Sequence, residues 1–371
     1  MKLMHSFDSR NNALNAIRLA LATEVIFLHS FQNTGRMPPE PIRQLLMSVG
    51  VDGFFAISGF LITSSWLSHP RVRDYLVARA LRILPGFYIC LAVTAFIIAP
   101  ISVVLQGGSA SKLLWSSGPI EYVLKNSAIA YLHWNVGGTP RGIPRAGDWN
   151  GSLWSLIYEI LCYLAVAVIG IAGLANRRWV SPTILALAVF AATMLPPLTL
   201  VQAWTIPQLL ARCAIMFAAG AVMYQWRDVI PARWWMVAVS WVIVVLSAAL
   251  LPDYRVVAAI PLAYAVIVSG ALIRNKFLRL STDLSYGTYI YAFPMQQLLI
   301  VCGLASLNPL VFFVFSTIAT LPLAAMSWFF VEKRAMSWKA RLLRRWSVQA
   351  QAEIGDEHNR NAPDPLARQA S

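Results

Sequence analysis

Apolar stretches of about 20 residues recur along this chain, and this repetition constrains its fold more than any other feature. A helix of about that length crosses the hydrocarbon of a bilayer, and it satisfies its own backbone hydrogen bonds there. Of the 371 residues, 58% are hydrophobic and only 12% are charged, whereas about a quarter of a soluble domain is charged. We therefore predict an all-α, polytopic integral membrane protein.

About ten transmembrane helices are expected. They cover 14–32, 45–66, 82–105, 152–173, 180–198, 207–225, 233–251, 257–273, 285–304 and 308–331. Lys and Arg lie mainly in alternate connections, which by the positive-inside rule predicts that both termini are cytoplasmic. The same alternation argues against the nucleic-acid partner that a formal charge of +14 suggests. We expect a multi-pass protein of the cytoplasmic (inner) membrane.

Three parts follow from this topology. A cytoplasmic segment (1–13) precedes a membrane domain (14–338), and a basic, then disordered cytoplasmic tail (339–371) ends the chain. The long loop at about 106–151 is expected outside, where an external molecule can enter. All four cysteines fall in apolar segments without a CxxC pair or a metal-ligand spacing, so we expect no metal site.

The first span contains three ionisable residues, and such residues inside a membrane point to function. Arg18 and His29 lie about 20° apart on one helix face and roughly 16 Å apart along its axis. Histidine accepts a proton near neutral pH, as the activation of a hydroxyl requires. The alternative is an interfacial histidine that caps or snorkels. Glu24 lies about 140° from His29, so any partner is expected on another helix.

Two further segments each allow a structural and a functional interpretation. The glycines of 50–63 permit close helix packing, and Asp52 is either an interfacial carboxylate or part of a site. Arg79 and Arg82 lie one helical turn apart at the expected entrance of the third span. They either bind phosphates or anchor the span in the membrane.

The fourth and sixth spans add more polar residues. Ser152, Ser155 and Glu159 share a helix face, although Ser152 alone is also a suitable helix cap and Trp154 a residue of the aromatic belt. Glu159 lies about two turns into the membrane and needs a partner or a water-filled cavity, and we favour a cavity. Arg212 is expected to balance a carboxylate or to face a donor group.

Together these segments resemble the acyltransferase-3 family of membrane proteins, which O-acylate bacterial surface glycans. The resemblance covers most of residues 11–338. Its ordered motifs are Arg18 and His29 separated by ten residues, GVDGFFAISGFLI at 50–62, Arg79 to Pro85, Ser152 to Glu159, the serine-tyrosine and aromatic-proline signature at 284–294, and Val331-Glu332-Lys333. Ala292 and Phe293 depart from the family pattern, which commonly has a histidine before this proline. Glu24 is also less usual than an apolar residue.

The resemblance implies a direct acyl transfer in which His29 is the general base, with Glu159 also in the catalytic centre. It further implies that Arg18, Arg79 and Arg82 bind acyl-CoA from the cytosol. Acyl-CoA, with acetyl-CoA expected, is then the donor substrate, and no tightly bound cofactor is expected. The residues expected to shape the cavity or contact substrate are Asp52, Ser58, Ser152, Trp154, Ser155 and Arg212.

The expected acceptor is a saccharide or a lipid-linked saccharide, and membrane lipids and glycan-biosynthesis proteins are the other expected partners. Acylation of a small molecule is a second interpretation. A secondary transporter or flippase, in which the intramembrane polar residues form a path, is a third. A noncatalytic scaffold is the fourth. The ordered motifs favour the enzyme over the last two.

Overall fold

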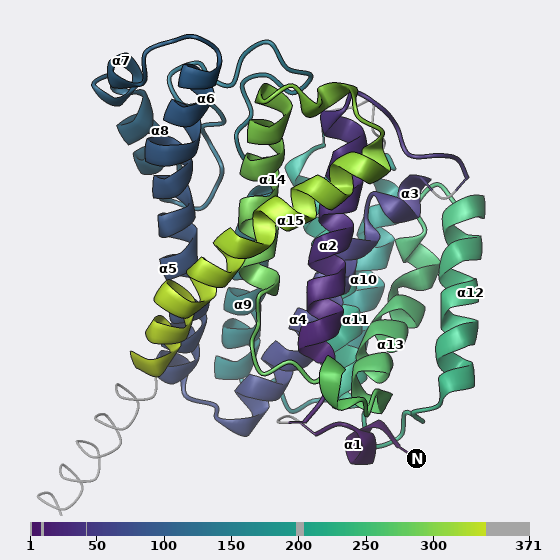
Figure 1. The fold of residues 1–371 in the computed structure, drawn as a ribbon. Coiled ribbons are helices and arrows are strands. Elements are labelled where there is room, and N and C mark those ends of the chain that lie inside the picture. The colour runs from purple at the N-terminus through teal and green to yellow at the C-terminus, as the bar shows by residue number, and fades with distance from the viewer. Residues whose placement is uncertain (1, 9–10, 42, 198–203, 339–371) are drawn as a thin grey trace, which may run out of the picture.

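The computed structural model describes residues 2–8, 11–41, 43–197 and 204–338, and its regular elements are all helices (Figure 1). The long helices are α2 (Leu14–Asn33), α4 (Val49–Ser68), α5 (Val72–Val93), α9 (Trp154–Ile171), α10 (Val180–Met194), α11 (Ile206–Gln225), α12 (Trp234–Leu250), α13 (Arg255–Leu272), α14 (Ser285–Val301) and α15 (Pro309–Ser327). The short elements are α1 (Leu3–Ser6), α3 (Arg43–Leu46), α6 (Ala99–Leu105), α7 (Ala110–Leu114), α8 (Gly118–Asn126), η1 (Thr94–Ile98), η2 (Lys276–Leu278), η3 (Leu304–Ser306) and η4 (Trp328–Glu332). The predicted all-α class is confirmed.

Each expected span contains a helix within the described residues. Seven helices are both long and apolar enough to cross a membrane, and α10 and α12 are shorter apolar helices. The chain is therefore a polytopic membrane protein. The tail expected at 339–371 lies outside the described residues.

The third span is longer than expected. Its helix begins at Val72 rather than at residue 82, and it continues through η1 and α6 to Leu105 as one apolar helix of 34 residues. Pro85 lies inside it, which membrane helices tolerate when neighbouring groups satisfy the freed carbonyl. As a consequence, Arg79 and Arg82 lie within a helix of the bundle and not at its entrance.

Helices α4 and α11 form a closely packed pair at the centre of the bundle. At Gly59 an added Cβ would overlap the carbonyl oxygen of Phe217, and at Gly220 it would overlap that of Ala56. Only glycine allows two helix backbones to approach in this way. This contact fixes α4, which carries the segment at 50–63 that the sequence singled out.

The two ends of the bundle differ. Figure 1 shows α1 at one end, which we call the N-terminal end, and α6, α7 and α8 at the other, which we call the loop end. Asp283, just before α14, is only 6% exposed. Helix α14 therefore begins inside the bundle, and the cavity described below lies beside its first two turns.

Candidate active site

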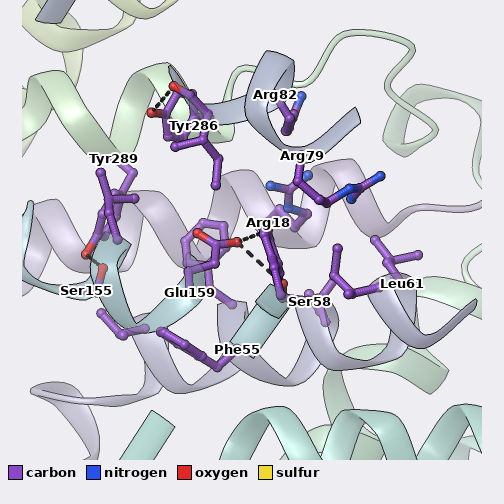
Figure 2. A pocket seen from close by; sticks show the side chains of 17 residues that line it. Arg18, Phe55, Ser58, Leu61, Arg79, Arg82, Ser155, Glu159, Tyr286 and Tyr289 are labelled. Carbon is purple, nitrogen blue, oxygen red and sulfur yellow. Dashed lines mark hydrogen bonds between the residues drawn. The ribbon is translucent and has the colours of Figure 1, made fainter. Parts of the chain in front are cut away.

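A cavity of about 100 Å³ lies between α2, α4, α5, α9 and α14 (Figure 2). Six of the residues predicted from the sequence line it, namely Arg18, Ser58, Arg79, Arg82, Ser155 and Glu159. They come from four different helices, so the fold brings together groups that are up to 141 positions apart in the chain. Aromatic side chains of α4, α9 and α14 form much of the remaining wall.

Two of the three arginines share a carboxylate that the sequence analysis missed. Arg18 and Arg82 both donate to Oδ2 of Asp283, while Oδ1 accepts from the hydroxyl of Ser285 at 2.5 Å. Burial raises the pKa of Asp283, but the two guanidinium groups outweigh that effect and hold this pKa well below its usual range. Asp283 therefore ties α2, α5 and the start of α14 together as an anion.

Arg79 is held differently. Its Cζ lies 6.0 Å from the centre of the Tyr163 ring, and its Nε is buried without a hydrogen-bond partner. Among the described residues, no carboxylate lies within ion-pair distance of Arg79. A cation that lines a cavity without a counter-ion is suited to bind an anionic ligand.

Hydroxyl groups and one carboxylate line the other side of the cavity. Tyr163 donates to Oε1 of Glu159, and Ser58 Oγ lies 3.4 Å from the same oxygen. Ser155 Oγ and the Tyr289 hydroxyl lie 2.7 Å apart. The predicted cavity position of Glu159 is therefore observed, with Tyr163 as the partner that its depth in the membrane requires.

His29 does not line this cavity. Its ring packs edge to face on Phe293, with the ring centres 5.0 Å apart, and its buried Nδ1 makes no hydrogen bond within the part of the chain that the structure describes. Phe293 is one helical turn beyond Tyr289 on α14, and Tyr289 does line the cavity. His29 thus lies about one turn of α14 further toward the loop end.

The loop at 106–151 closes over His29 from that end. Arg145 lies with its Cζ 5.1 Å from the centre of the Phe293 ring, and it donates to the side chain of Gln32 at 2.9 Å. Gln297 of α14 donates to the backbone carbonyls of Arg145 and Asp148 at 2.8 and 2.6 Å. These loop contacts cover His29 from the loop end, and the sequence contained no signal for them.

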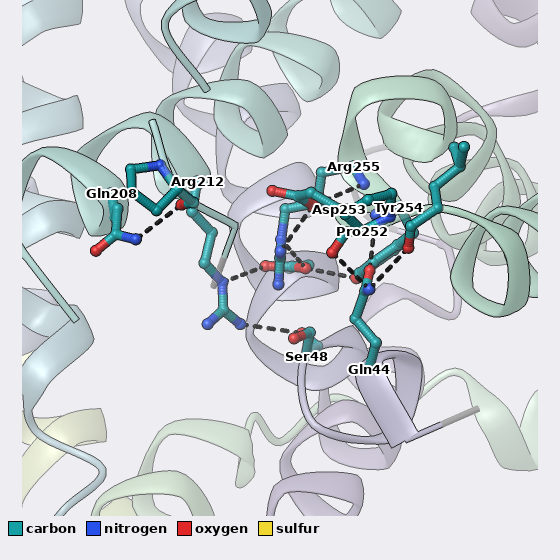
Figure 3. Close-up of polar contacts among 11 residues, drawn as sticks. Gln44, Ser48, Gln208, Arg212, Pro252, Asp253, Tyr254 and Arg255 are labelled. Atoms are coloured by element: carbon teal, nitrogen blue, oxygen red, sulfur yellow. Dashed lines mark hydrogen bonds and ion pairs between the residues drawn. The ribbon is translucent and has the colours of Figure 1, made fainter. Parts of the chain in front are cut away.

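Arg212 belongs to a second polar cluster, which Figure 3 shows together with Tyr254 and Arg255, and Asp52 is the carboxylate that joins them. Arg212 Nε lies 2.9 Å from Asp52 Oδ1, and Arg255 Nε lies 2.7 Å from Oδ2. Tyr254 donates to the same Oδ2 at 2.5 Å. The sequence left two interpretations open for Arg212, balancing a carboxylate or facing a donor group, and in the structure its carboxylate partner is Asp52. Trp154 lies beside it, with the Arg212 Cζ 5.3 Å from its ring centre.

Two remaining residues have buried polar atoms without partners. The Ser152 hydroxyl makes no hydrogen bond in the described residues, although the carbonyl of Ser152 accepts from Tyr289 at 2.8 Å. Glu24 packs against Gly50 of α4, and its buried Oε1 has no hydrogen-bond partner among the described residues. Glu24 therefore faces α4, the helix that carries Asp52, and not His29.

The comparisons with known proteins agree with one another. A family model described as an acyltransferase domain matches residues 11–329. The chain is 28% identical over 347 residues to an O-acetyl transferase of Shigella phage Sf6, covering 88% of this chain and 97% of that protein. It is 26% identical over 372 residues to Nodulation protein 10 of Rhizobium leguminosarum bv. viciae, covering 93% and 98%. No solved structure matches.

Proposed function

Because the chain belongs to the acyltransferase-3 family, whose model matches residues 11–329, we propose that it transfers an acyl group from acyl-CoA to a hydroxyl of an extracytoplasmic or lipid-linked saccharide. Acetyl is the first group to test, since one relative is an O-acetyl transferase. The observation that carries the proposal is the convergence of Arg18, Arg79 and Arg82 on one cavity.

The donor binds in that cavity and enters from the N-terminal end, which faces the cytoplasm. Guanidinium groups suit the phosphates of CoA because they donate in a planar fork that matches phosphate oxygens. The orientation is supported by the connections at this end, which contain Arg71, Arg177, Arg178 and Arg227. The membrane domain is then 14–338, and the loop at 106–151 faces outward.

His29 is the general base of the transfer. It removes the proton of the acceptor hydroxyl as the oxygen attacks the thioester carbonyl, so that an O–C bond forms and the C–S bond breaks. The thiolate of CoA leaves and takes up a proton. Among the described residues no side chain hydrogen-bonds Nδ1 of His29, and this supports the role. Because Phe293 packs against His29, its ring has to move for the acyl carbon to meet an acceptor hydroxyl that is bound to the base.

The other predicted residues have supporting positions in this proposal. Glu159, hydrogen-bonded to Tyr163 and near Ser58, orients the acyl end of the donor with Ser155. Asp52, Arg212, Trp154 and Ser152 shape the loop side of the centre, where the acceptor binds. Glycan-biosynthesis proteins supply that acceptor.

The proposal is tested by measuring ester-linked acyl groups on surface glycans in a deletion strain. The strain is complemented with wild type, with His29→Ala or with His69→Ala, a control at the C-terminal end of α4. Membrane expression of each is checked by immunoblot. We expect wild type and His69→Ala to restore the ester and His29→Ala to lose it. Equal restoration by His29→Ala would refute the proposed base, and no restoration by wild type would refute the proposed acceptor.

A further inference from the structure

The segment between α6 and α9 exposes large apolar side chains although it lies outside the ten expected spans. Trp115, directly after α7, is 91% exposed, and Ile120 and Leu124 of α8 are 55% and 65% exposed. Clustered exposed apolar residues mark a surface that contacts a partner or a membrane. The question is which of these covers α8.

Helix α8 has three different faces. At 100° per residue, Ile120 and Leu124 lie about 40° apart on an exposed apolar face. The next face carries Glu121 and Lys125, which form an exposed ion pair at 2.9 Å. The third face is turned to the protein, where Tyr122 is fully buried. A helix with one face for protein, one for water and one exposed apolar face has the pattern of an interfacial helix.

The depth of α8 agrees with that pattern. Helix α8 packs beside α5 and η1 (Figure 1), and the Tyr88 hydroxyl donates to the carbonyl of Ser127 at 3.0 Å. Tyr88 follows Val72 by 16 residues, about 24 Å along the helix axis, which is less than the roughly 30 Å of bilayer hydrocarbon. The C-terminal end of α8 therefore lies no higher than the edge of the hydrocarbon.

The helix beside α8 also exposes apolar side chains. Ile89 of α5 and Phe96 and Ile97 of η1 are 43%, 42% and 53% exposed in the part of that helix against which α8 packs. Since the helix from Val72 to Leu105 spans the membrane, its exposed apolar side chains face lipid. Lipid alone therefore accounts for the exposed apolar face of α8, without a protein partner.

Backbone polar groups after α8 have hydrogen-bond partners within the protein, as a position with little water requires. The side chain of Asn126 donates to the carbonyl of His133 at 2.7 Å and accepts from the backbone N–H of His133 at 3.1 Å. Non-helical backbone near lipid requires such internal partners. This reciprocal pair allows the connection to turn back at the membrane surface.

We propose that α8 and Trp115 are embedded in the headgroup region of the leaflet at the loop end, with the bilayer itself as the occupant of the exposed face. Ile120 and Leu124 contact acyl chains, the Trp115 ring lies among the headgroups, and Lys125 extends its ammonium group toward the headgroups. The loop that closes over His29 is thereby anchored to the membrane and does not project freely into water.

Fluorescent labelling of neighbouring positions on α8 tests this proposal. Cys302 is replaced by Ser, because it is exposed while the other three cysteines are buried. A nitrobenzoxadiazole label is then placed by Leu124→Cys or by the matched control Lys125→Cys, and both proteins are reconstituted in phosphatidylcholine nanodiscs. Quenching by doxyl-labelled lipid and by aqueous iodide is compared.

We expect doxyl lipid to quench the Leu124→Cys label at least threefold more than iodide does, and the Lys125→Cys label to show the reverse order. Stronger iodide quenching at both positions would place α8 in water and overturn the proposal. Protection of the Leu124→Cys label from both quenchers would mean that protein, such as a second copy, covers it, and would equally overturn it. The pair Ile120→Cys and Glu121→Cys repeats the test one turn earlier if labelling at 124 prevents folding.

Discussion

Replacing Asp283 with Asn should destabilise the protein strongly, because the change keeps the shape of the side chain and removes its charge. The Asp283 side chain is 8% exposed and accepts from Arg18 and Arg82, which are 20% and 17% exposed. Removing one partner of a buried ion pair costs about 3–5 kcal/mol. Both arginines line the cavity and are partly exposed, so they are less costly without their partner than fully buried charges are. We therefore expect Asp283→Asn to lower the free energy of unfolding by less than this, about 2–3 kcal/mol.

Unfolding by sodium dodecyl sulfate in mixed micelles, followed by circular dichroism, measures this loss. Asp228→Asn is the matched control, since Asp228 pairs with Arg178 at the surface, where the two side chains are 34% and 54% exposed. Such surface pairs contribute about 0–1 kcal/mol. If Asp283→Asn lowers the free energy of unfolding no more than Asp228→Asn does, the inference that Asp283 ties α2, α5 and α14 together is wrong.

The pH dependence of this loss has a definite sign. The pKa of Asp283 is lowered in the folded protein, so its ionised form stabilises the fold at any pH above its unfolded pKa of about 3.9. That stabilisation is lost as the pH falls from there toward the folded pKa. The difference in unfolding free energy between wild type and Asp283→Asn should therefore have its largest value at pH 7, and it should decrease below about pH 4. A difference that widens on acidification would refute the argument.

Three further substitutions test the packing and the cavity. Gly220→Ala places a Cβ on the carbonyl oxygen of Ala56 and should lower the melting temperature in detergent, and an unchanged temperature would contradict the close approach of α4 and α11. Tyr289→Phe removes the donor to the buried carbonyl of Ser152 and should cost about 1–3 kcal/mol of unfolding free energy, whereas a neutral result would mean that water replaces it. Arg79→Gln should raise the KM for the acyl-CoA donor about tenfold, with Arg79→Lys in between, because a guanidinium without a counter-ion is best suited to phosphate. An unchanged KM would place the donor phosphates elsewhere.

Hydropathy predicted the helices well because lipid leaves few alternatives, and the main error has a physical cause. The start of the third span was predicted too late because Arg79 and Arg82 lower the apolar character of the segment after Val72. In the fold these arginines line a cavity inside the bundle, so their charge does not end the helix. The start of a span is therefore poorly predicted wherever its charged residues face a cavity.

The candidate site was predictable where a polar residue stood out against an apolar span. Glu159 and Arg18 stood out in this way, and the roughly 16 Å between Arg18 and His29 along one helix agrees with the position of His29 outside the cavity. Asp283 and Arg145 did not stand out, because polar residues are ordinary in connections. Only the folded chain shows that one is buried between two arginines and that the other lies over Phe293.

The cluster around Asp52 has a consequence for how the protein is made. Arg212 and Arg255 are synthesised 160 and 203 residues after Asp52, and a lone arginine in hydrocarbon is unstable there. Helix α4 must therefore already be in the bilayer, with its carboxylate ready, when α11 and α13 leave the translocon. Asp52→Asn should leave nascent chains associated longer with the insertion machinery, because Arg212 then arrives without its carboxylate, whereas Arg255 keeps its ion pair with Asp253.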